Sequence, residues 1–426
     1  MRGKARLVTV GLTTALLCGG ALLDACRSGN VAGHGVATAP GNVVPASRGK
    51  TRPPPFFAAR SHPTYYAGPD RELPPPEGVA EVELGWFGPS DARDPATRRM
   101  WCAATLAVEE ANAGGGYRET PFRLLPVWSE NPWGTGIGEA VRLAYRDHLW
   151  AFTGAPDGPS AHLLTQVAAK ARLPFVSPVA TDPTSNLANV PWIFSCAPGD
   201  HLHAPVLARA IVAAAAGRPC AIVSCTDHDA RVYRQTLLRA LARVQAFPAL
   251  HLEFQPAARD FAAQLDSLTA TPPAALIVVA GAADAAGFVV AARNAGLTMP
   301  IFGGPWMGQA YFLERAGALA EDVVFPLLWD PREGGQAAVN FADRFRHASG
   351  LEPDYTAACT YDSVALLCAA VRDAGLNRAR IGDALRALSP WTGVSGTITW
   401  DATGQNSRSV GLGTIHNGQV VALPAD

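Results

Sequence analysis

The chain has 426 residues, enough for two domains with extensions, since a domain commonly takes roughly 100–200 residues. Hydrophobic residues make up 48% of it and charged residues 17%, which is typical of a packed globular protein and excludes global disorder. The formal net charge of −1 leaves no large charge field, so the sequence predicts no nucleic-acid partner.

The N-terminus carries the segment best suited to entering a membrane. Three basic residues within the first six precede an apolar run over 7–23, which is the pattern of an export signal. Ala25 and Cys26 then resemble the lipobox of bacterial lipoproteins, in which the cysteine is acylated, although Asp24 departs from that box. We expect a signal peptide over 1–26 with Cys26 as the lipidation site. Ordinary cleavage after Ala25 and an uncleaved anchor remain open alternatives.

Beyond Cys18 and Cys26 the sequence contains six cysteines, an even number that can pair in an exported protein in 15 ways. They are Cys102, Cys196, Cys220, Cys225, Cys359 and Cys368. Several lie in apolar runs, where a free thiol packs as a small hydrophobe, so free thiols are the alternative to disulfides. No CxxC and no histidine at zinc-finger spacing accompany them, so we expect no metal and no cofactor.

Residues 27–78 have the composition of a tether. Proline is frequent among glycine, serine and alanine, with three consecutive prolines at 53–55 and again at 74–76. Such a segment buries too little apolar surface to offset its ordering entropy. After a lipid anchor it would hold a folded domain away from the membrane.

From residue 79 onward, strands and helices alternate. The first series is predicted as strand 82–87, helix 97–112, strand 122–128, helix 136–148, strand 149–153 and helix 160–171. This order predicts a parallel sheet with right-handed crossovers.

The stretch Leu173–Pro183 follows this series and changes character abruptly. It is apolar up to Val176 and then continues with small and hydroxylated residues, among them Ala180 and Thr181. That change marks the carboxyl end of a buried parallel strand, and ligand crevices open at such ends.

The alternation then restarts. The second series is predicted as strand 192–196, helix 201–215, strand 221–225, helix 229–244, a helix around 261–268, strand 275–280, helix 284–295 and strand 300–302. Two series of similar size indicate two similar lobes. The remainder, from 323, is predicted to hold a strand, three helical stretches and a β-rich tail that cross back to complete both lobes.

The order and spacing of several segments are recognisable together. They are LGWFGP, LAVEEANAGGG, FTGAPDGPS, LPFVSPVATDPT, DHDARVY, FVVAARNAGLTMPIFGG, YDSVALLCAAV and GTITWDATGQ. Over residues 82–423 the chain resembles the type 1 periplasmic solute-binding proteins, specifically the Leu/Ile/Val-binding family that serves ABC transporters.

The resemblance implies an α/β fold of two doubly wound parallel-sheet lobes joined by three hinge crossings, with the ligand between the lobes. The expected crossings lie near Cys196–Pro198, Phe325–Asp330 and Ser389–Thr392. The expected lobes comprise 79–196 with 330–390, and 197–329 with 391–426.

The same resemblance implies an exported protein, either periplasmic or a membrane-anchored lipoprotein. Its partners would be a small-molecule solute and the membrane permease of an ABC transporter. The alternative is a ligand sensor of the same fold that signals to a membrane receptor.

In the first lobe, the family binds a ligand carboxylate with hydroxyl groups at a helix N-terminus, where free N–H groups and the helix dipole favour an anion. The family's serine pair falls on Asp157 and Gly158 here. Asp157 is a candidate ligand-binding residue that would either repel a solute carboxylate or attract a cationic group. Ser160 is the candidate substitute, although it equally suits an N-cap of its own helix. Ala180 and Thr181 match ligand-contacting positions, and the alternative is a simple turn cap.

In the second lobe, Asp229 and Tyr233 match an acidic and an aromatic cleft position, with an N-cap role as the alternative for Asp229. Trp306 stands where the family has an acid that pairs with the ligand's ammonium group. Because an unpaired ammonium in a closed cleft is costly, the sequence argues against a plain branched-chain amino acid.

Aromatic residues predict apolar cleft walls, although each suits core packing as well. They are Trp86, Phe87, Trp128, Trp133 and Trp306. Arg93 is the candidate for holding an anionic group.

A catalytic function is not predicted. The one provocative cluster, Asp227-His228-Asp229, places adjacent side chains on a turn where they diverge, and neither GxSxG nor HExxH occurs. We expect a binding protein and no enzyme.

Overall fold

The structure, a computed structural model, describes residues 65–129, 131–145, 149–188, 190–332 and 335–424, which belong to one compact unit. The predicted signal peptide, Cys26 and residues 27–64 of the predicted tether lie outside the described residues. No helix within the described ranges has both the length and the apolarity needed to cross a membrane.

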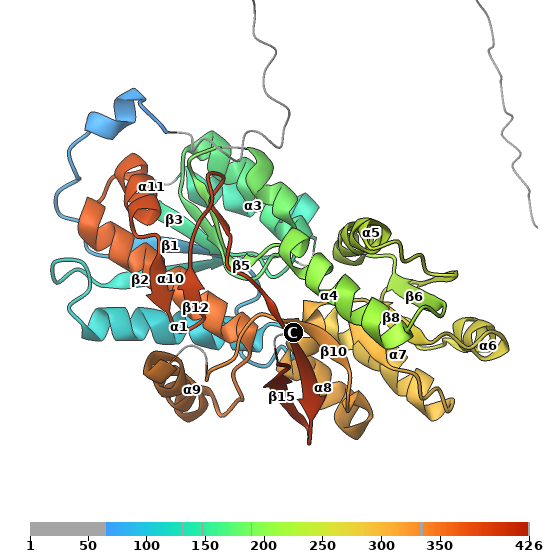
Figure 1. Ribbon diagram of the computed structural model, residues 1–426. Coiled ribbons are helices and arrows are strands. Elements are labelled where there is room, and N and C mark those ends of the chain that lie inside the picture. The colour runs from blue at the N-terminus through green and yellow to red at the C-terminus, as the bar shows by residue number, and fades with distance from the viewer. Residues whose placement is uncertain (1–64, 130, 146–148, 189, 333–334, 425–426) are drawn as a thin grey trace, which may run out of the picture. The chain divides into compact units, whose positions relative to one another are not determined.

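The described chain is α/β and is built on two main sheets (Figure 1). The first is a six-stranded parallel sheet. In spatial order its strands are β13 (Gln405–Asn406), β5 (Ile193–Pro198), β4 (Phe175–Ser177), β3 (Leu149–Gly154), β1 (Val82–Phe87) and β2 (Phe122–Val127).

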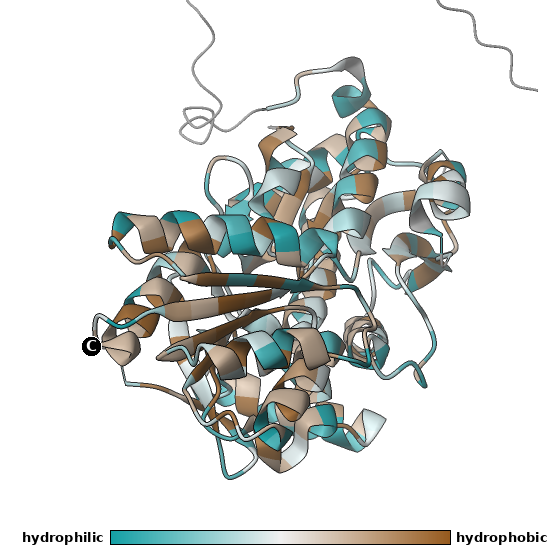
Figure 2. Ribbon diagram, turned by 90° about the vertical axis from the view of Figure 1, so that its right-hand side faces the viewer, coloured by the Kyte–Doolittle hydropathy of each residue, from teal (hydrophilic) through white to brown (hydrophobic). Residues whose placement is uncertain are grey.

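Helices cover both faces of this sheet and form, with it, what we call the first lobe. They are α1 (Arg98–Ala113), α2 (Ile137–Ala144), α3 (Gly158–Ala171), α9 (Gly335–Ser349), α10 (Tyr355–Ala374) and α11 (Arg378–Ala387). Alternate residues of β1 point to opposite faces, so Trp86 packs in the core beneath α1 and α10 and Phe87 in the core beneath α2 and α3. Figure 2 faces the second lobe, described next, where hydrophobic strands likewise lie between helices of mixed hydropathy.

The second sheet has seven strands and, with its helices, forms the second lobe. Its strands are β15 (Gln419–Ala422), β14 (Gly411–His416), β10 (Val324–Leu327), β9 (Ile301–Gly303), β8 (Ala275–Val279), β6 (Cys220–Cys225) and β7 (Leu250–Phe254). The pairings that involve β14 are antiparallel and the others are parallel.

The helices of the second lobe pack against a single apolar core. They are α4 (Asp200–Ala215), α5 (His228–Arg243), α6 (Ala262–Ala270), α7 (Ala282–Asn294) and α8 (Ala310–Ala316). Short helical turns complete the chain at η2 (Pro69–Glu72), η3 (Pro132–Gly136), η4 (Pro183–Ala188), η5 (Pro305–Gly308) and η6 (Gly317–Ala320).

The chain passes between the lobes three times. The first crossing runs from β5 to α4 and the second from β10 to α9, as the sequence predicted. Side chains tie the crossings together: Asn406 Nδ2 donates to Cys196 O at 2.6 Å, and Arg408 donates to Leu328 O at 2.6 Å.

The third crossing differs from the prediction at Ser389–Thr392. The hairpin of β11 (Trp391–Gly393) and β12 (Gly396–Ile398) stays in the first lobe, because the buried Asp362 of α10 accepts hydrogen bonds from Val394 N at 2.9 Å and Ser395 N at 2.7 Å. β13 then pairs with β5, so the crossing lies between β13 and β14. Residues 391–406 therefore belong to the first lobe and not, as the sequence suggested, to the second.

The described end of the predicted tether also differs from expectation, because it packs on the first lobe. Asn377 Nδ2 donates to the carbonyl oxygens of Asp70, Arg71 and Leu73 at 3.1, 3.3 and 3.2 Å. The ring of Tyr66 lies 5.1 Å from that of Trp192. The sequence did not predict this contact. A proline-rich composition shows that a segment has few core residues, but it does not show which side chains its backbone carbonyls bind.

The six cysteines within the described ranges are free thiols, which decides the question that the sequence left open. Cys102 is half-buried and the other five are buried. Burial raises the pKa of Cys359 and of Cys368 to about 12, so these thiols are inert core residues.

Candidate site at three helix N-termini

The N-terminus of α3 is the first wall of the candidate site. Asp157, and not Ser160, is its N-cap, because the Asp157 side chain accepts a hydrogen bond from Ser160 N at 2.8 Å. Ser160 therefore lies inside the first turn, almost fully buried, and its Oγ has no hydrogen-bond partner among the described residues. The hydroxyl group is available to a ligand and is not used for capping.

Asp229 reaches this wall from the second lobe. Its Oδ2 accepts a hydrogen bond from Gly158 N, the first amide of α3, at 3.0 Å. The N-cap of α5 is Asp227, which accepts from Ala230 N at 2.9 Å, so Asp229 is not the cap that the sequence left open. The carboxylate of the protein itself thus occupies the anion-binding end of α3.

The environment of Asp229 disfavours its charge. Burial raises its pKa to about 7 against the lowering effect of the Gly158 hydrogen bond, and the neighbouring charge of Asp157 adds to the increase. Its second oxygen, Oδ1, is buried without a partner among the described residues. A β-carbon added at Gly158 would lie 2.2 Å from this oxygen, so glycine is required for the lobes to approach this closely.

The loop after β4 forms the second wall and contacts α4. Ala180 and Thr181 are both buried, and Thr181 O accepts a hydrogen bond from Asp200 N at 2.9 Å. Burial raises the pKa of the Asp200 carboxyl well above its usual range, and a hydrogen bond with the Thr181 side chain only partly opposes this. The neutral form of Asp200 is therefore favoured, and its Oδ1 has no hydrogen-bond partner among the described residues, with His203 Nδ1 lying 3.8 Å away.

Aromatic residues of the second lobe form the third wall. The Tyr233 ring is fully buried and lies 5.4 Å from the Trp306 ring, edge to face, and 6.4 Å from the His203 ring. The Tyr233 hydroxyl has no partner among the described residues. Burial raises its pKa well above the usual value, and burial lowers that of His203 to about 3, so both side chains are neutral.

Four buried oxygen atoms without hydrogen-bond partners among the described residues lie in the first two turns of α3, α4 and α5. They are Ser160 Oγ, Asp200 Oδ1, Asp229 Oδ1 and Tyr233 Oη. Buried polar groups are nearly always hydrogen-bonded, and an unpaired one costs about 1–3 kcal/mol. A polar solute held among these elements would satisfy several of them at once.

Five predicted residues lie elsewhere. Trp86 and Phe87 are fully buried in the two cores of the first lobe, and Trp86 Nε1 donates to Pro89 O at 3.1 Å. Arg93 is on an exposed loop with 90% of its side chain accessible, where it pairs with Asp91 at 3.0 Å. The Trp128 ring lies 5.4 Å from that of Phe87 at the edge of the first-lobe core, and Trp133 is exposed on η3. The aromatic contribution to the site is therefore reduced to Tyr233 and Trp306.

The strongest site residues that the sequence missed are Asp200 and His203, in the first turn of α4. Their signal was present, since an acid and a histidine at i and i+3 directly after a buried strand lie on one helix face. Tyr355, at the start of α10, was also missed, and its hydroxyl accepts a hydrogen bond from Gln309 Nε2 at 2.9 Å.

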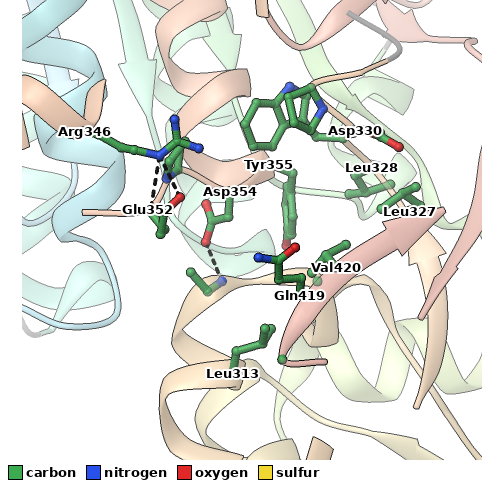
Figure 3. Close-up of a pocket in the computed structure, with 16 residues that line it drawn as sticks. Leu313, Leu327, Leu328, Asp330, Arg346, Glu352, Asp354, Tyr355, Gln419 and Val420 are labelled. Carbon is green, nitrogen blue, oxygen red and sulfur yellow. Dashed lines mark hydrogen bonds and ion pairs between the residues drawn. The ribbon is translucent and has the colours of Figure 1, made fainter. Parts of the chain in front are cut away.

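A cavity of about 460 Å³ is lined in part by Tyr355 (Figure 3). Both lobes line it, with Leu313 and Leu327 from the second lobe and Arg346 and Asp354 from the first. Asp354 accepts a hydrogen bond from Ala310 N at 2.9 Å, which joins the lobes there. None of the predicted site residues lines this cavity, so it is a separate feature.

Comparison with known proteins identifies the class. The family model of the periplasmic binding proteins matches residues 82–419, so the chain belongs to that family. Members act outside the cytoplasm and bind solutes, which agrees with the prediction that the chain is not an enzyme.

Individual relatives are more distant. An amino acid binding protein of Pseudomonas aeruginosa is 25% identical over 337 residues, which cover 76% of this chain and 87% of that one. The branched-chain amino acid transporter substrate-binding protein LivJ of Streptococcus pneumoniae, solved with isoleucine, has a TM-score of 0.73 and 23% identity over 80% of this chain and 98% of its own.

A solute-binding protein of R. palustris in complex with benzoate has a TM-score of 0.72 at 16% identity, over 81% of this chain and 96% of its own. These likenesses confirm the predicted type 1 fold. The two solved proteins bind chemically different solutes on that fold.

Proposed function

We propose that the chain is an extracytoplasmic solute-binding protein that captures a small polar or amino-acid-like solute between its lobes and delivers it to an ABC transporter permease. The observation that carries the proposal is the set of unpaired, buried polar atoms contributed by both lobes at the starts of α3, α4 and α5. Membership of the periplasmic binding protein family supports it.

The charges around the site favour a solute that donates hydrogen bonds. The charges of Asp182 and Asp229 add to the raised pKa of Asp200, and the charge of Asp157 adds to the raised pKa of Asp229. Asp229 already lies at the N-terminus of α3, so a solute carboxylate would have to displace it. An amine, amide or amidine facing Asp229, with an apolar part against Trp306, fits both observations.

A thermal-shift screen tests this directly. Amino acids, polyamines, amides, short peptides and aromatic acids are each added to the purified protein, and the unfolding temperature is followed with concentration. A solute that binds the folded state stabilises it by about 2.7 kcal/mol at 100 times its dissociation constant. The proposal fails if no small solute raises the unfolding temperature and the small-angle scattering profile stays unchanged throughout.

Attachment of the mature protein to the membrane through Cys26 is part of the same proposal. The chain resembles lipoprotein precursors at Ala25-Cys26, and a lipid anchor would keep the binding lobes close to a permease. Intact mass of the natively expressed protein is expected to show an acylated N-terminal cysteine. An unmodified N-terminus at any other residue would contradict the lipidation.

A further inference from the structure

Two imidazoles and one carboxylate meet across the lobes beside the candidate site. His162 Nε2 lies 2.9 Å from Asp182 Oδ2, and His228 Nε2 lies 3.2 Å from the same oxygen. The two rings are 5.8 Å apart and nearly perpendicular. His162 comes from α3 and Asp182 from the loop after β4 in the first lobe, whereas His228 begins α5 in the second.

The carboxylate at the centre of this cluster is fixed in place. Asp182 is buried, and its other oxygen, Oδ1, accepts hydrogen bonds from Thr184 N at 2.9 Å and Thr184 Oγ1 at 2.7 Å. The histidines are more accessible, with 26% of the His162 side chain and 44% of the His228 side chain exposed. The Asp182 carboxylate is therefore held in one position, while the two imidazoles can be reached from solvent.

We propose that His162, Asp182 and His228 bind one divalent transition-metal ion of the Zn²⁺ class across the two lobes. Imidazole nitrogen and carboxylate oxygen are preferred ligands of such ions. Tetrahedral bonds of about 2.0–2.1 Å place neighbouring ligand atoms about 3.3–3.4 Å apart. The observed separations of 2.9 and 3.2 Å, with all three ligand atoms within 4.8 Å of one another, need only small adjustments to reach this geometry.

Hydrogen bonds can fill the acceptor sites of the Asp182 carboxylate, but the same geometry also directs two imidazole nitrogens and one carboxylate oxygen toward a common point. Both Nε2 atoms converge on a single oxygen, while the second oxygen is already occupied by Thr184. Thr184 Oγ1 also lies 2.8 Å from His162 Nε2, so it can support or complete the coordination shell. A cation at this point would accept a lone pair from each of the three ligand atoms, Nε2 of both histidines and Oδ2 of Asp182.

Such an ion would couple metal binding to lobe closure. Two ligands belong to the first lobe and one to the second, so the complete site exists only when the lobes are together. His228 directly precedes Asp229 in the chain. A metal ion that holds His228 in place therefore also holds Asp229 against Gly158 N. By linkage, a metal ion and a solute that both favour the closed state increase each other's affinity.

The test uses the full chain, prepared without a polyhistidine tag and stripped with EDTA, and isothermal titration with ZnCl₂. We expect one site in the wild type, weakened at least about 100-fold by His162→Ala and by His228→Ala. The matched control is His416→Ala, since His416, Glu321 and Asp322 form a second cluster, among the described residues, of side chains of the metal-ligand type, which lies entirely in the second lobe. This control is expected to leave the site unchanged.

Small-angle scattering distinguishes a bridging ion from one held by a single lobe. Zn²⁺ is expected to reduce the radius of gyration of the wild type and to leave that of His228→Ala unchanged. Circular dichroism verifies that the variants, which alter partly exposed side chains, are folded. Absence of Zn²⁺ binding at micromolar concentration, or binding that His416→Ala removes and His162→Ala leaves intact, would overturn the proposal.

Discussion

Replacing Asp229 by asparagine isolates the contact that joins the two lobes at α3. Asparagine keeps an oxygen that can accept from Gly158 N, but it carries no charge in the buried site. Its amide group also adds donors next to an acid-rich surface. The substitution therefore removes the unfavourable charge while it conserves shape.

The expected effect depends on pH with a definite sign. The pKa of Asp229 is about 7 in the folded protein and about 3.9 in an unfolded chain, so the folded state holds an extra proton between these values. Stability from this group is complete below about pH 4 and is lost as pH rises to about 7. At 1.36 kcal/mol per pH unit the loss is at most about 4 kcal/mol, and the asparagine variant, which has no proton to lose, does not suffer it.

Urea unfolding of the wild type and of Asp229→Asn at pH 5, 6, 7 and 8 measures this difference. We expect the variant to gain stability relative to the wild type as pH rises, by up to about 3 kcal/mol between pH 5 and pH 8. Asp266→Asn, on the exposed surface of α6, is the control and should show no such trend. A difference that is constant across this pH range would refute the buried, protonated Asp229.

Three further substitutions test contacts at Tyr233, Gly158 and Asn377. Tyr233→Phe removes a buried hydroxyl that has no partner, so the free energy of unfolding should stay within about 1 kcal/mol while solute affinity falls about tenfold, which chemical unfolding and calorimetry measure separately. Gly158→Ala places a β-carbon 2.2 Å from Asp229 Oδ1 and should increase the radius of gyration in small-angle scattering; an unchanged radius would mean that the lobes do not meet there. Asn377→Ala removes three hydrogen bonds to the segment 65–76 and the N-cap of α11, so limited proteolysis should cleave that segment faster, at a cost of about 1–2 kcal/mol in stability.

Much of the fold was predictable because its elements have strong patterns. Continuous apolar runs such as the one at Ala275–Val279 became buried parallel strands, and most helices began within two residues of their predicted positions. The edge strand β7 was missed, since only its last residue is buried and its sequence gives little signal. The third crossing was misplaced because Asp362, distant in sequence, holds the 391–398 hairpin in the first lobe.

The candidate site was predictable in location and not in its internal contacts. The loop at Ala180-Thr181 and the starts of α3 and α5 do come together. That Asp229 would bond to Gly158, and not cap its own helix, depends on an approach between residues 71 positions apart. Trp86 was predicted to line the cleft because a residue at the end of a strand can face either the core or a ligand crevice. In the structure α1 and α10 cover it, so it belongs to the core.

Calorimetric titration of the best solute from the screen locates the binding site most directly. If the solute lies between α3, α4 and α5, Trp306→Ala should weaken binding at least about tenfold, because it removes the aromatic wall. Gln419→Ala, in the cavity of Figure 3, should then leave the affinity unchanged. The opposite pattern, with binding lost in Gln419→Ala and retained in Trp306→Ala, would place the solute in that cavity and contradict the site proposed at the three helix N-termini.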